Sequence, residues 1–344
     1  MTKVYKRILV FNVNWLGDVL FTTPAIRVLR KSFPDSYIAC AAPARCAQLL
    51  KNNPSINEFI SFDERGSFKS VFSKIAFIFS LRKKKFDAVF LFHRSFTRLM
   101  ICFFAGIKNR IGYSRRKNNL LLTGKIDPIE RDSVHRIDYF LNIVRPYVGK
   151  IDDKSYELKV NKRDILDVRN ILEEKGVKSS DQLVVLNPGA NWPLKRWPVD
   201  NFAKLINLLS KEPGLKVIVV GAKEDQGLVE KILSLSKSEA VVLTGQLNLI
   251  QLAALFSLSS IVISADSGPM HIAIAVEVSV IALFGPTDYR ITGPVDVDKN
   301  TVLKKDIDCD IPCFKLDCAD NICMSQITAE EVLEVIKTKL LMRP

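Results

Sequence analysis

The sequence has no apolar run long enough to span a lipid bilayer, which excludes a transmembrane helix of about 20 residues. Outside the predicted strands, the longest apolar stretch is 71–81, and Lys74 interrupts it. We also expect no cleavable secretory signal, because Asn12, Asn14 and Asp18 break the segment that would have to be its apolar centre. We therefore expect a cytoplasmic protein.

Glycine-rich dinucleotide signatures, low-complexity tracts and internal repeats are missing as well. Without G-x-G-x-x-G and an acidic residue about 20 positions later, a NAD-dependent oxidoreductase is disfavoured. The contents of 48% hydrophobic and 25% charged residues are typical of an ordinary globular protein. At 344 residues the chain is long enough for two domains, each with its own core.

Acidic residues are scarce in the first half of the chain. Residues 1–172 contain 32 Lys and Arg but only 15 Asp and Glu, a net charge of +17, whereas the remainder contains 18 and 22, a net charge of −4. The first half should therefore attract an anionic partner. Nucleic acid is not expected as that partner, because the basic residues are dispersed and no recognised DNA- or RNA-binding module is present.

Seven cysteines in a cytoplasmic chain do not predict a disulfide framework. Cys40, Cys46 and Cys102 lie in apolar surroundings and are expected in the core. The other four follow one another at spacings of four, five and five, looser than the paired C-x-x-C ligands of most zinc sites. No metal site is predicted from this spacing, and the alternative is a metal or redox cluster of Cys309, Cys313, Cys318 and Cys323.

Short β-rich runs alternate with helical segments along the whole chain. The alternation predicts two doubly wound α/β domains, each a parallel sheet with helices on both faces, facing one another across a cleft. The polar segment 149–163 is the predicted link, so the domains are 1–163 and 164–327, followed by a helix in 328–344. Strands are predicted at 8–13, 37–42, 58–62, 88–93, 183–187, 216–220, 240–243, 261–264 and 279–283, and helices at 24–31, 44–51, 164–175 and 328–341.

The most informative turn contains Asp266, Ser267 and Gly268, between an apolar strand and a helix. Backbone N–H groups at a helix start attract phosphate, while Ser267 adds a donor and Gly268 lets a ligand approach the backbone. A second turn with Gly285 and Thr287 follows the next strand. Because ligands of open α/β sheets bind beyond the carboxyl ends of the strands, we predict a nucleotide site in the C-terminal half.

The loop 187–198 follows the first strand of the second half and contains Gly189, aromatic residues and two cations. A phosphate-bearing ligand suits this composition, because Lys195 could neutralise a departing diphosphate. The alternative is a solvated lysine, which is the usual state of a lone lysine.

Asp18 follows the opening strand of the first half, and Thr22, Thr23 and Pro24 begin the predicted helix. A carboxylate at this strand end can take a proton from an incoming hydroxyl group. Equally, Asp18 can cap the helix through backbone N–H groups.

Residues 68–85 predict an amphipathic helix with an aromatic face and a basic end. Phe72, Ile75 and Phe79 share that face, and four cations follow at 82–85. Such a helix either lies on an anionic membrane surface or buries its apolar face in the core.

Four motifs stand at predicted strand ends: Gly17-Asp18 with Thr22-Thr23-Pro24, Pro188-Gly189-Ala190 with Lys195-Arg196-Trp197-Pro198, Asp266 to His271, and Phe284-Gly285-Pro286-Thr287. Together they resemble glycosyltransferase family 9, the lipopolysaccharide heptosyltransferases, over nearly the whole chain. The segments 42–46 and 103–107 resemble its heptosyltransferase II branch. The resemblance implies a GT-B fold of two Rossmann-like domains.

The resemblance also implies an activity: inverting transfer of heptose from ADP-heptose to the inner core of lipopolysaccharide, with no required metal or cofactor. Asp18 is the implied general base, and Lys195 the implied donor-phosphate residue. The alternative is a family member that uses another nucleotide-sugar or another acceptor, such as an O-antigen or other cell-surface glycan. The implied donor contacts are Gly189, Ala190, Lys195, Glu224, Asp266, Ser267, Gly268, His271, Gly285, Pro286 and Thr287.

The acceptor is expected in the first domain, where His93 and Arg94 follow a strand and Arg98 lies four residues beyond Arg94. Arginine side chains suit the phosphates and carboxylates of lipid A and Kdo, so the expected acceptor contacts are Gly17, His93, Arg94 and Arg98. By resemblance to GT-B enzymes, the final helix is expected to cross back to the first domain. We expect peripheral contact with the anionic inner face of the cytoplasmic membrane.

Overall fold

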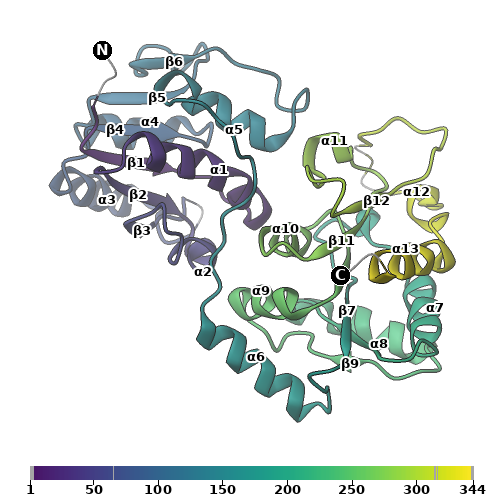
Figure 1. Cartoon of the computed structure of the whole chain (residues 1–344). Coiled ribbons are helices and arrows are strands. Elements are labelled where there is room, and N and C mark those ends of the chain that lie inside the picture. The colour runs from purple at the N-terminus through teal and green to yellow at the C-terminus, as the bar shows by residue number, and fades with distance from the viewer. Residues whose placement is uncertain (1–3, 65, 314, 316, 342–344) are drawn as a thin grey trace. The chain divides into compact units, whose positions relative to one another are not determined.

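The computed structural model describes residues 4–64, 66–313, 315 and 317–341, which belong to two units, 1–159 and 160–344 (Figure 1). Each unit is built on one six-stranded sheet. The division follows Lys159, inside the segment predicted as the link. No described helix combines the length and the apolar character needed to cross a membrane.

The first sheet has the strand order β3-β2-β1-β4-β5-β6, and every pair of neighbouring strands is parallel. This is the order of a Rossmann fold, in which the chain winds outward from β1 on one side and from β4 on the other. The strands are β1 (Arg7–Phe11), β2 (Tyr37–Ala42), β3 (Glu58–Ser61), β4 (Ala88–Leu91), β5 (Asn109–Tyr113) and β6 (Gly124–Ile126). The helices are α1 (Leu16–Ser32), α2 (Ala47–Leu50), α3 (Val71–Lys83), α4 (Phe96–Phe104) and α5 (Arg136–Val144).

The second sheet repeats that winding order, β12-β11-β10-β7-β8-β9, again with parallel pairs. Its strands are β7 (Gln182–Asn187), β8 (Leu215–Val219), β9 (Val241–Val242), β10 (Ile261–Ala265), β11 (Ser279–Leu283) and β12 (Thr301–Leu303). Its helices are α6 (Lys162–Glu174), α7 (Val199–Leu209), α8 (Gln226–Leu235), α9 (Leu249–Leu258), α10 (Gly268–Ala275), α11 (Tyr289–Thr292), α12 (Ile322–Ser325) and α13 (Ala329–Leu341).

All nine predicted strands form, with ends within two residues of the prediction. Strands β5, β6 and β12 were not predicted from the sequence. Strand β5 contains a polar pair, Asn109 and Arg110, and a glycine, whereas β6 and β12 have three residues each. Such short or polar strands carry no periodic signal of their own, because their pairing is fixed by the sheet edge that they join.

The prediction that Pro24 begins the first helix is wrong. Helix α1 begins at Leu16 and contains Pro24 in its interior, so Pro24 cannot donate to the carbonyl of Leu20 four residues earlier. The hydroxyl of Thr23 donates to the Leu20 carbonyl oxygen at 2.7 Å. A side-chain donor thus replaces the missing backbone donor, and Asp18 lies in the first turn of α1.

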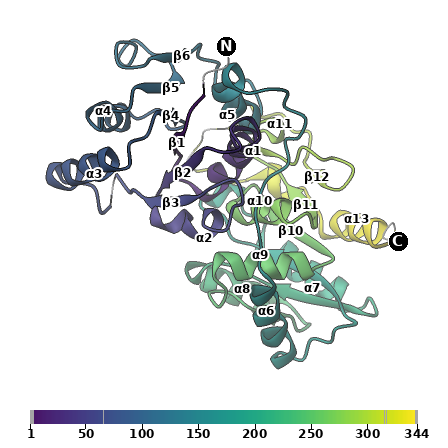
Figure 2. The same ribbon diagram turned by 60° about the vertical axis from the view of Figure 1, so that its left-hand side comes forward.

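In the first unit, one face of the sheet packs against α3 and α4, which lie side by side (Figures 1 and 2). The buried aromatic rings of Phe11, Phe62 and Phe77 form the centre of that layer, with ring centroids 4.6–6.4 Å apart. The other face is covered by α1 and α5, where Phe92 contacts Phe140 at 5.7 Å between ring centroids. Both faces of β1 and β4 are therefore buried, as a parallel sheet requires.

In the second unit, α7, α8 and α13 cover one face of the sheet. Trp197 donates its ring N–H to the carbonyl oxygen of Ile327 at 2.8 Å, directly before α13. Thr328 and Glu331 form the predicted capping box, with bonds of 2.8 and 3.2 Å. These contacts fix α13 on α7 and tie it to the loop that contains Lys195.

We expect Phe202→Ala to destabilise the second unit by about 3–5 kcal/mol, because Phe202 is 2% exposed and packs edge-on against Trp197. Phe72→Ala is the matched control, since Phe72 is 85% exposed and its loss should change stability by less than about 0.5 kcal/mol. Urea unfolding of both variants measures this difference. Equal losses would contradict the assignment of Phe202 to the core.

Candidate functional site

Each sheet has one place where the winding direction reverses, between β1 and β4 in the first unit and between β7 and β10 in the second. The connections that leave these two strands diverge to opposite sides, which opens a crevice beyond their carboxyl ends. In the first unit the loops concerned are 12–15 and 92–95. In the second unit they are 188–198 and 266–267.

The crevice of the first unit is polar. The side-chain amide of Asn14 lies 3.3 Å from Nε2 of His93, and this pair borders two adjoining pockets of about 660 and 170 Å³. The larger is also lined by Glu64, Lys69, Lys74 and Ser95. The smaller is lined by Asp18, Arg94, Arg131 and the aromatic rings of Trp15, Phe92, Tyr139 and Phe140. Three of the predicted residues, Asp18, His93 and Arg94, therefore lie around one pocket.

Asp18 accepts a hydrogen bond from Arg131 at 3.2 Å, and its side chain is one-fifth exposed. The arginine comes from the polar segment before α5, which sequence reasoning did not single out. This ion pair orients the carboxylate of Asp18, in the first turn of α1, at the wall of the smaller pocket. Gly17 precedes it in the same turn.

Arg98 lies in the interior and not on the wall of either pocket. Its side chain is fully buried and donates to the backbone carbonyl of Asn12 and, at 2.5 Å, to Oδ1 of Asn14. Burial lowers the pKa of Arg98 to about 10, although Glu64, 3.5 Å away, favours the charged form. Arg98 thus holds the β1 loop in place, whereas Arg94, over the ring of Tyr139, lines the smaller pocket together with Arg131.

In the second unit, a buried asparagine joins the two loops of the crevice. The side-chain amide of Asn187, at the end of β7, donates to the carbonyl oxygen of Gly189 at 3.1 Å and to Oγ of Ser264 at 3.0 Å. Its distance to Oγ of Ser267 is 3.4 Å. Nothing in the sequence marks Asn187 beyond its place at a strand end, yet it connects the loop 188–198 to the turn 266–268.

Lys195 is paired rather than solvated. Its ammonium group donates to Oδ2 of Asp266 at 2.6 Å, and Asp266 is 6% exposed. Burial by itself would raise the pKa of Asp266, but the charges of Lys195 and His271 outweigh it, so the pKa lies below its ordinary value. Nε2 of His271 is 3.8 Å from the other carboxylate oxygen. The side chain of Lys195 is 21% exposed, so this ion pair is open to solvent on the lysine side.

The turn 266–268 leads directly into α10, whose first residue is Gly268. Oγ of Ser267 lies 3.0 Å from Oγ of Ser264, so this hydroxyl group faces the strand end and does not cap the helix. The helix start and Lys195 together supply positive potential at the same strand ends.

Gly189 is needed for close approach of two loops. A Cβ atom at this position would lie 2.3 Å from a carboxylate oxygen of Asp225. That oxygen accepts from the backbone N–H of Ala222 at 2.9 Å and so closes the turn η4 (Lys223–Asp225). Asp225 is therefore structural, while its neighbour Glu224 is exposed and available to a ligand.

Gly285 serves packing. A Cβ atom there would lie 2.5 Å from Sδ of Met324 and 2.9 Å from Sγ of Cys323, both on α12. The next residue, Pro286, accepts from the backbone N–H of Cys313 at 2.8 Å. The second predicted donor turn, which continues into Thr287, thus supports the cysteine-containing segment.

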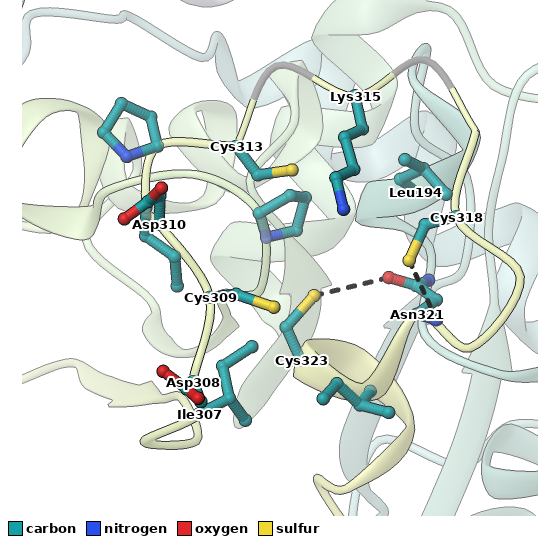
Figure 3. Close-up of a pocket in the computed structure, with 14 residues that line it drawn as sticks. Leu194, Ile307, Asp308, Cys309, Asp310, Cys313, Lys315, Cys318, Asn321 and Cys323 are labelled. Atoms are coloured by element: carbon teal, nitrogen blue, oxygen red, sulfur yellow. Dashed lines mark hydrogen bonds between the residues drawn. The ribbon is translucent and has the colours of Figure 1, made fainter.

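That segment borders a pocket of about 740 Å³ beside Leu194, the neighbour of Lys195 (Figure 3). Figure 3 shows Cys309, Cys313, Cys318 and Cys323 around it. Burial and the three neighbouring thiols raise the pKa of Cys323. Among the described residues, no group of three or more His, Cys, Asp or Glu side chains is arranged to hold a metal ion.

Two parallel sheets of the same winding order, each with a polar crevice at its reversal point, are the architecture of the GT-B class of glycosyltransferases. The fold matches a glycosyltransferase family 9 crystal structure from Veillonella parvula with a TM-score of 0.88, 26% identity and coverage of 100% of this chain and 99% of that one. It also matches Escherichia coli ADP-heptose lipopolysaccharide heptosyltransferase II, with a TM-score of 0.80, 25% identity and coverage of 97% and 98%.

Sequence comparison identifies the family. The model of glycosyltransferase family 9 (heptosyltransferase) matches residues 75–322, more than half of the chain. A curated relative, lipopolysaccharide heptosyltransferase 2 of Salmonella typhimurium strain LT2, is 27% identical over 310 residues, which cover 84% of this chain and 85% of the relative. The chain belongs to glycosyltransferase family 9.

We expect Asp266→Asn to lower the free energy of unfolding at pH 7 by about 1–3 kcal/mol, the usual cost of losing a hydrogen bond between charged groups. Because the folded-state pKa of Asp266 is depressed, its contribution is full above the ordinary Asp value of about 4 and is lost as the pH falls below it. Chemical denaturation between pH 7 and pH 3 measures both effects.

The exposed Asp167→Asn serves as the control for a general loss of negative charge in the same unit. The gap between the wild type and Asp266→Asn should narrow as the pH falls, and the control should show no gap. A gap that stays constant down to pH 3 would mean that the carboxylate of Asp266 is not the group responsible.

Proposed function

We propose that this glycosyltransferase transfers heptose from ADP-heptose to the inner core of lipopolysaccharide, with inversion at the anomeric carbon. Family membership supports the sugar, because the curated relatives include lipopolysaccharide heptosyltransferase 2 of Salmonella typhimurium. The name of the Escherichia coli structure, ADP-heptose lipopolysaccharide heptosyltransferase II, supports the donor. The observation that carries the proposal is the Lys195–Asp266 pair at the start of α10.

In this proposal the second unit binds the donor. Lys195 neutralises the diphosphate as ADP departs, and the N-terminus of α10 adds backbone donors. Glu224 contacts the ribose, since its carboxylate is exposed while that of Asp225 closes a turn. The positive charge of Lys195 stabilises the departing diphosphate, as a metal ion does in other transferases, so no metal or other cofactor is required.

The first unit binds the acceptor in the same proposal. The pockets around His93 carry Lys69, Lys74 and Arg94, whose charges suit the carboxylates of Kdo and the phosphates of lipid A. Asp18 takes the proton of the acceptor hydroxyl group. The freed oxygen attacks the anomeric carbon from the face opposite to the leaving ADP, which inverts the configuration. We place the reaction in the cytoplasm, at the inner face of the membrane that holds the acceptor lipid.

The donor assignment predicts a selective thermal shift. Among ADP, UDP, GDP, CMP and NAD, ADP alone should raise the melting temperature, because a ligand at 100 times its dissociation constant stabilises the fold by about 2.7 kcal/mol. Lys195→Gln should weaken the response to ADP by removing the phosphate contact, and Asp18→Asn should leave it unchanged. A shift with UDP or GDP instead would replace the donor but keep the class of enzyme.

The general-base assignment predicts that Asp18→Asn reduces transfer by about 100- to 10,000-fold while the dissociation constant for ADP stays the same. Single-turnover assays with ADP-heptose and a Kdo-containing acceptor measure the rate. Arg131→Gln is the matched variant, since it removes the partner of Asp18 but keeps the carboxylate. If Arg131→Gln loses as much rate as Asp18→Asn, or if Asp18→Asn turns over normally, Asp18 is not the base.

A further inference from the structure

Helices α3 and α4 expose a continuous group of large apolar side chains. On α3, Phe72 and Phe79 stand seven residues apart, two helical turns, and are 85% and 57% exposed. On α4, Phe96 and Phe103 have the same spacing. The two helices lie side by side and contact each other (Figure 2). We call this group the aromatic face: Val71, Phe72, Ile75, Phe79, Phe96, Phe103 and Phe104.

The aromatic face is not the core-facing side of these helices. The core side of α3 is formed by Phe77 and Leu81, which are 4% and 0% exposed, and that of α4 by Leu99 and Cys102. Helix α3 is therefore apolar on two sides, one of which packs on the sheet. Contiguous exposed apolar patches of this kind mark interaction sites in soluble proteins. The apolar face predicted from the sequence, with Phe72, Ile75 and Phe79, is therefore exposed and not buried in the core.

The stretch of sequence that carries the aromatic face contains few acidic residues. Residues 65–126, which include α3 and α4, contain 15 Lys and Arg but a single acidic residue, Asp87. The carboxylate of Asp87 is engaged by the backbone N–H groups of Lys6 and Arg7, at 2.7 and 2.8 Å. The exposed cations close to the face in sequence are Lys69, Arg82, Lys83, Lys85 and Lys108.

We propose that the aromatic face is the docking surface of this protein for an anionic phospholipid bilayer. Phenylalanine side chains enter the boundary between head groups and acyl chains, while the flanking cations bind lipid phosphates. A second copy of the chain fits less well, because pairing two aromatic faces would bring two strongly basic rims together. The charge of the rim thus distinguishes a lipid surface from a self-interface.

The docking surface shares helix α3 with the acceptor pocket of the proposed function, on which this step of the inference rests. Lys74 belongs to α3 and lines the pocket of about 660 Å³ together with Lys69 and His93. A bilayer bound to the aromatic face would hold its head groups at the depth of the cationic rim. The saccharide of a lipid-embedded acceptor would then enter the pocket from the membrane side, without leaving the bilayer.

Flotation with unilamellar vesicles tests the proposal. The full-length protein should bind vesicles that contain anionic phosphatidylglycerol and should not bind pure phosphatidylcholine, and binding should weaken between about 0.1 and 0.5 M salt. The double variant Phe72→Ser/Phe79→Ser should lose at least about tenfold in vesicle affinity. Lys83→Glu should also weaken binding to the anionic vesicles, because it reverses one charge of the rim.

Leu166→Ser is the matched control, because Leu166 is 59% exposed on α6 of the other unit and its replacement should leave vesicle binding unchanged. Unchanged binding by the double variant would overturn the proposal. Concentration-dependent dimers that the same double variant abolishes would overturn it as well, in favour of a self-interface. If the melting temperatures of the variants equal that of the Leu166→Ser control, the variants are folded.

Turnover separates this inference from the proposed function. The double variant should transfer sugar normally to a water-soluble acceptor without acyl chains, yet transfer more slowly to the same saccharide anchored in vesicles. If no sugar is transferred by any form of the protein, the proposed function fails while the vesicle result still decides the docking surface. If both acceptors are affected equally, the aromatic face acts through the pocket and not through a membrane.

Discussion

The reversal of winding direction in each parallel sheet is the constraint on which the rest of this structure depends. A parallel sheet that is covered by helices on both faces is built from right-handed crossovers. The chain can therefore place helices on both faces only if it returns to the centre of the sheet and winds outward in the opposite direction. At that point two neighbouring strands end side by side, and the connections that follow them leave toward opposite faces of the sheet. In this protein every predicted site residue of the first unit, and the Lys195–Asp266 pair of the second, is close in sequence to such an end.

Buried polar side chains hold the loops that follow those strand ends in one arrangement. Arg98 holds the loop after β1 from inside, and Asn187 links the two loops of the second crevice. Buried polar groups without partners would cost stability, so each network fixes one arrangement of its loop. Arg98 and Asn187 thus support the loops next to His93 and Lys195, the residues that we propose as ligand contacts.

The sequence predicted the fold well because most strands are apolar and bounded by turn residues, and the site partly because phosphate chemistry favours glycine, hydroxyl groups and cations at helix starts. Prediction from the sequence failed where the role of a residue depends on a partner that is distant in the sequence. Arg131 reaches Asp18 from a polar loop more than a hundred residues away, and Arg98 is indistinguishable from a surface arginine until its burial is known. Gly285 resembled a ligand-binding glycine, but its neighbours are the sulfur atoms of α12.

Thr23 and Pro24 show how such dependence limits evolution. The hydroxyl group of Thr23 occupies the carbonyl that Pro24 leaves without a donor, and it also accepts the backbone N–H of Glu157 at 3.0 Å. If threonine were replaced first, the buried carbonyl of Leu20 and the half-buried N–H of Glu157 would lose their partner at once. If proline were replaced first, the restored backbone N–H would make the threonine dispensable for the helix. The pair is therefore expected to be lost in one order only, with proline before threonine.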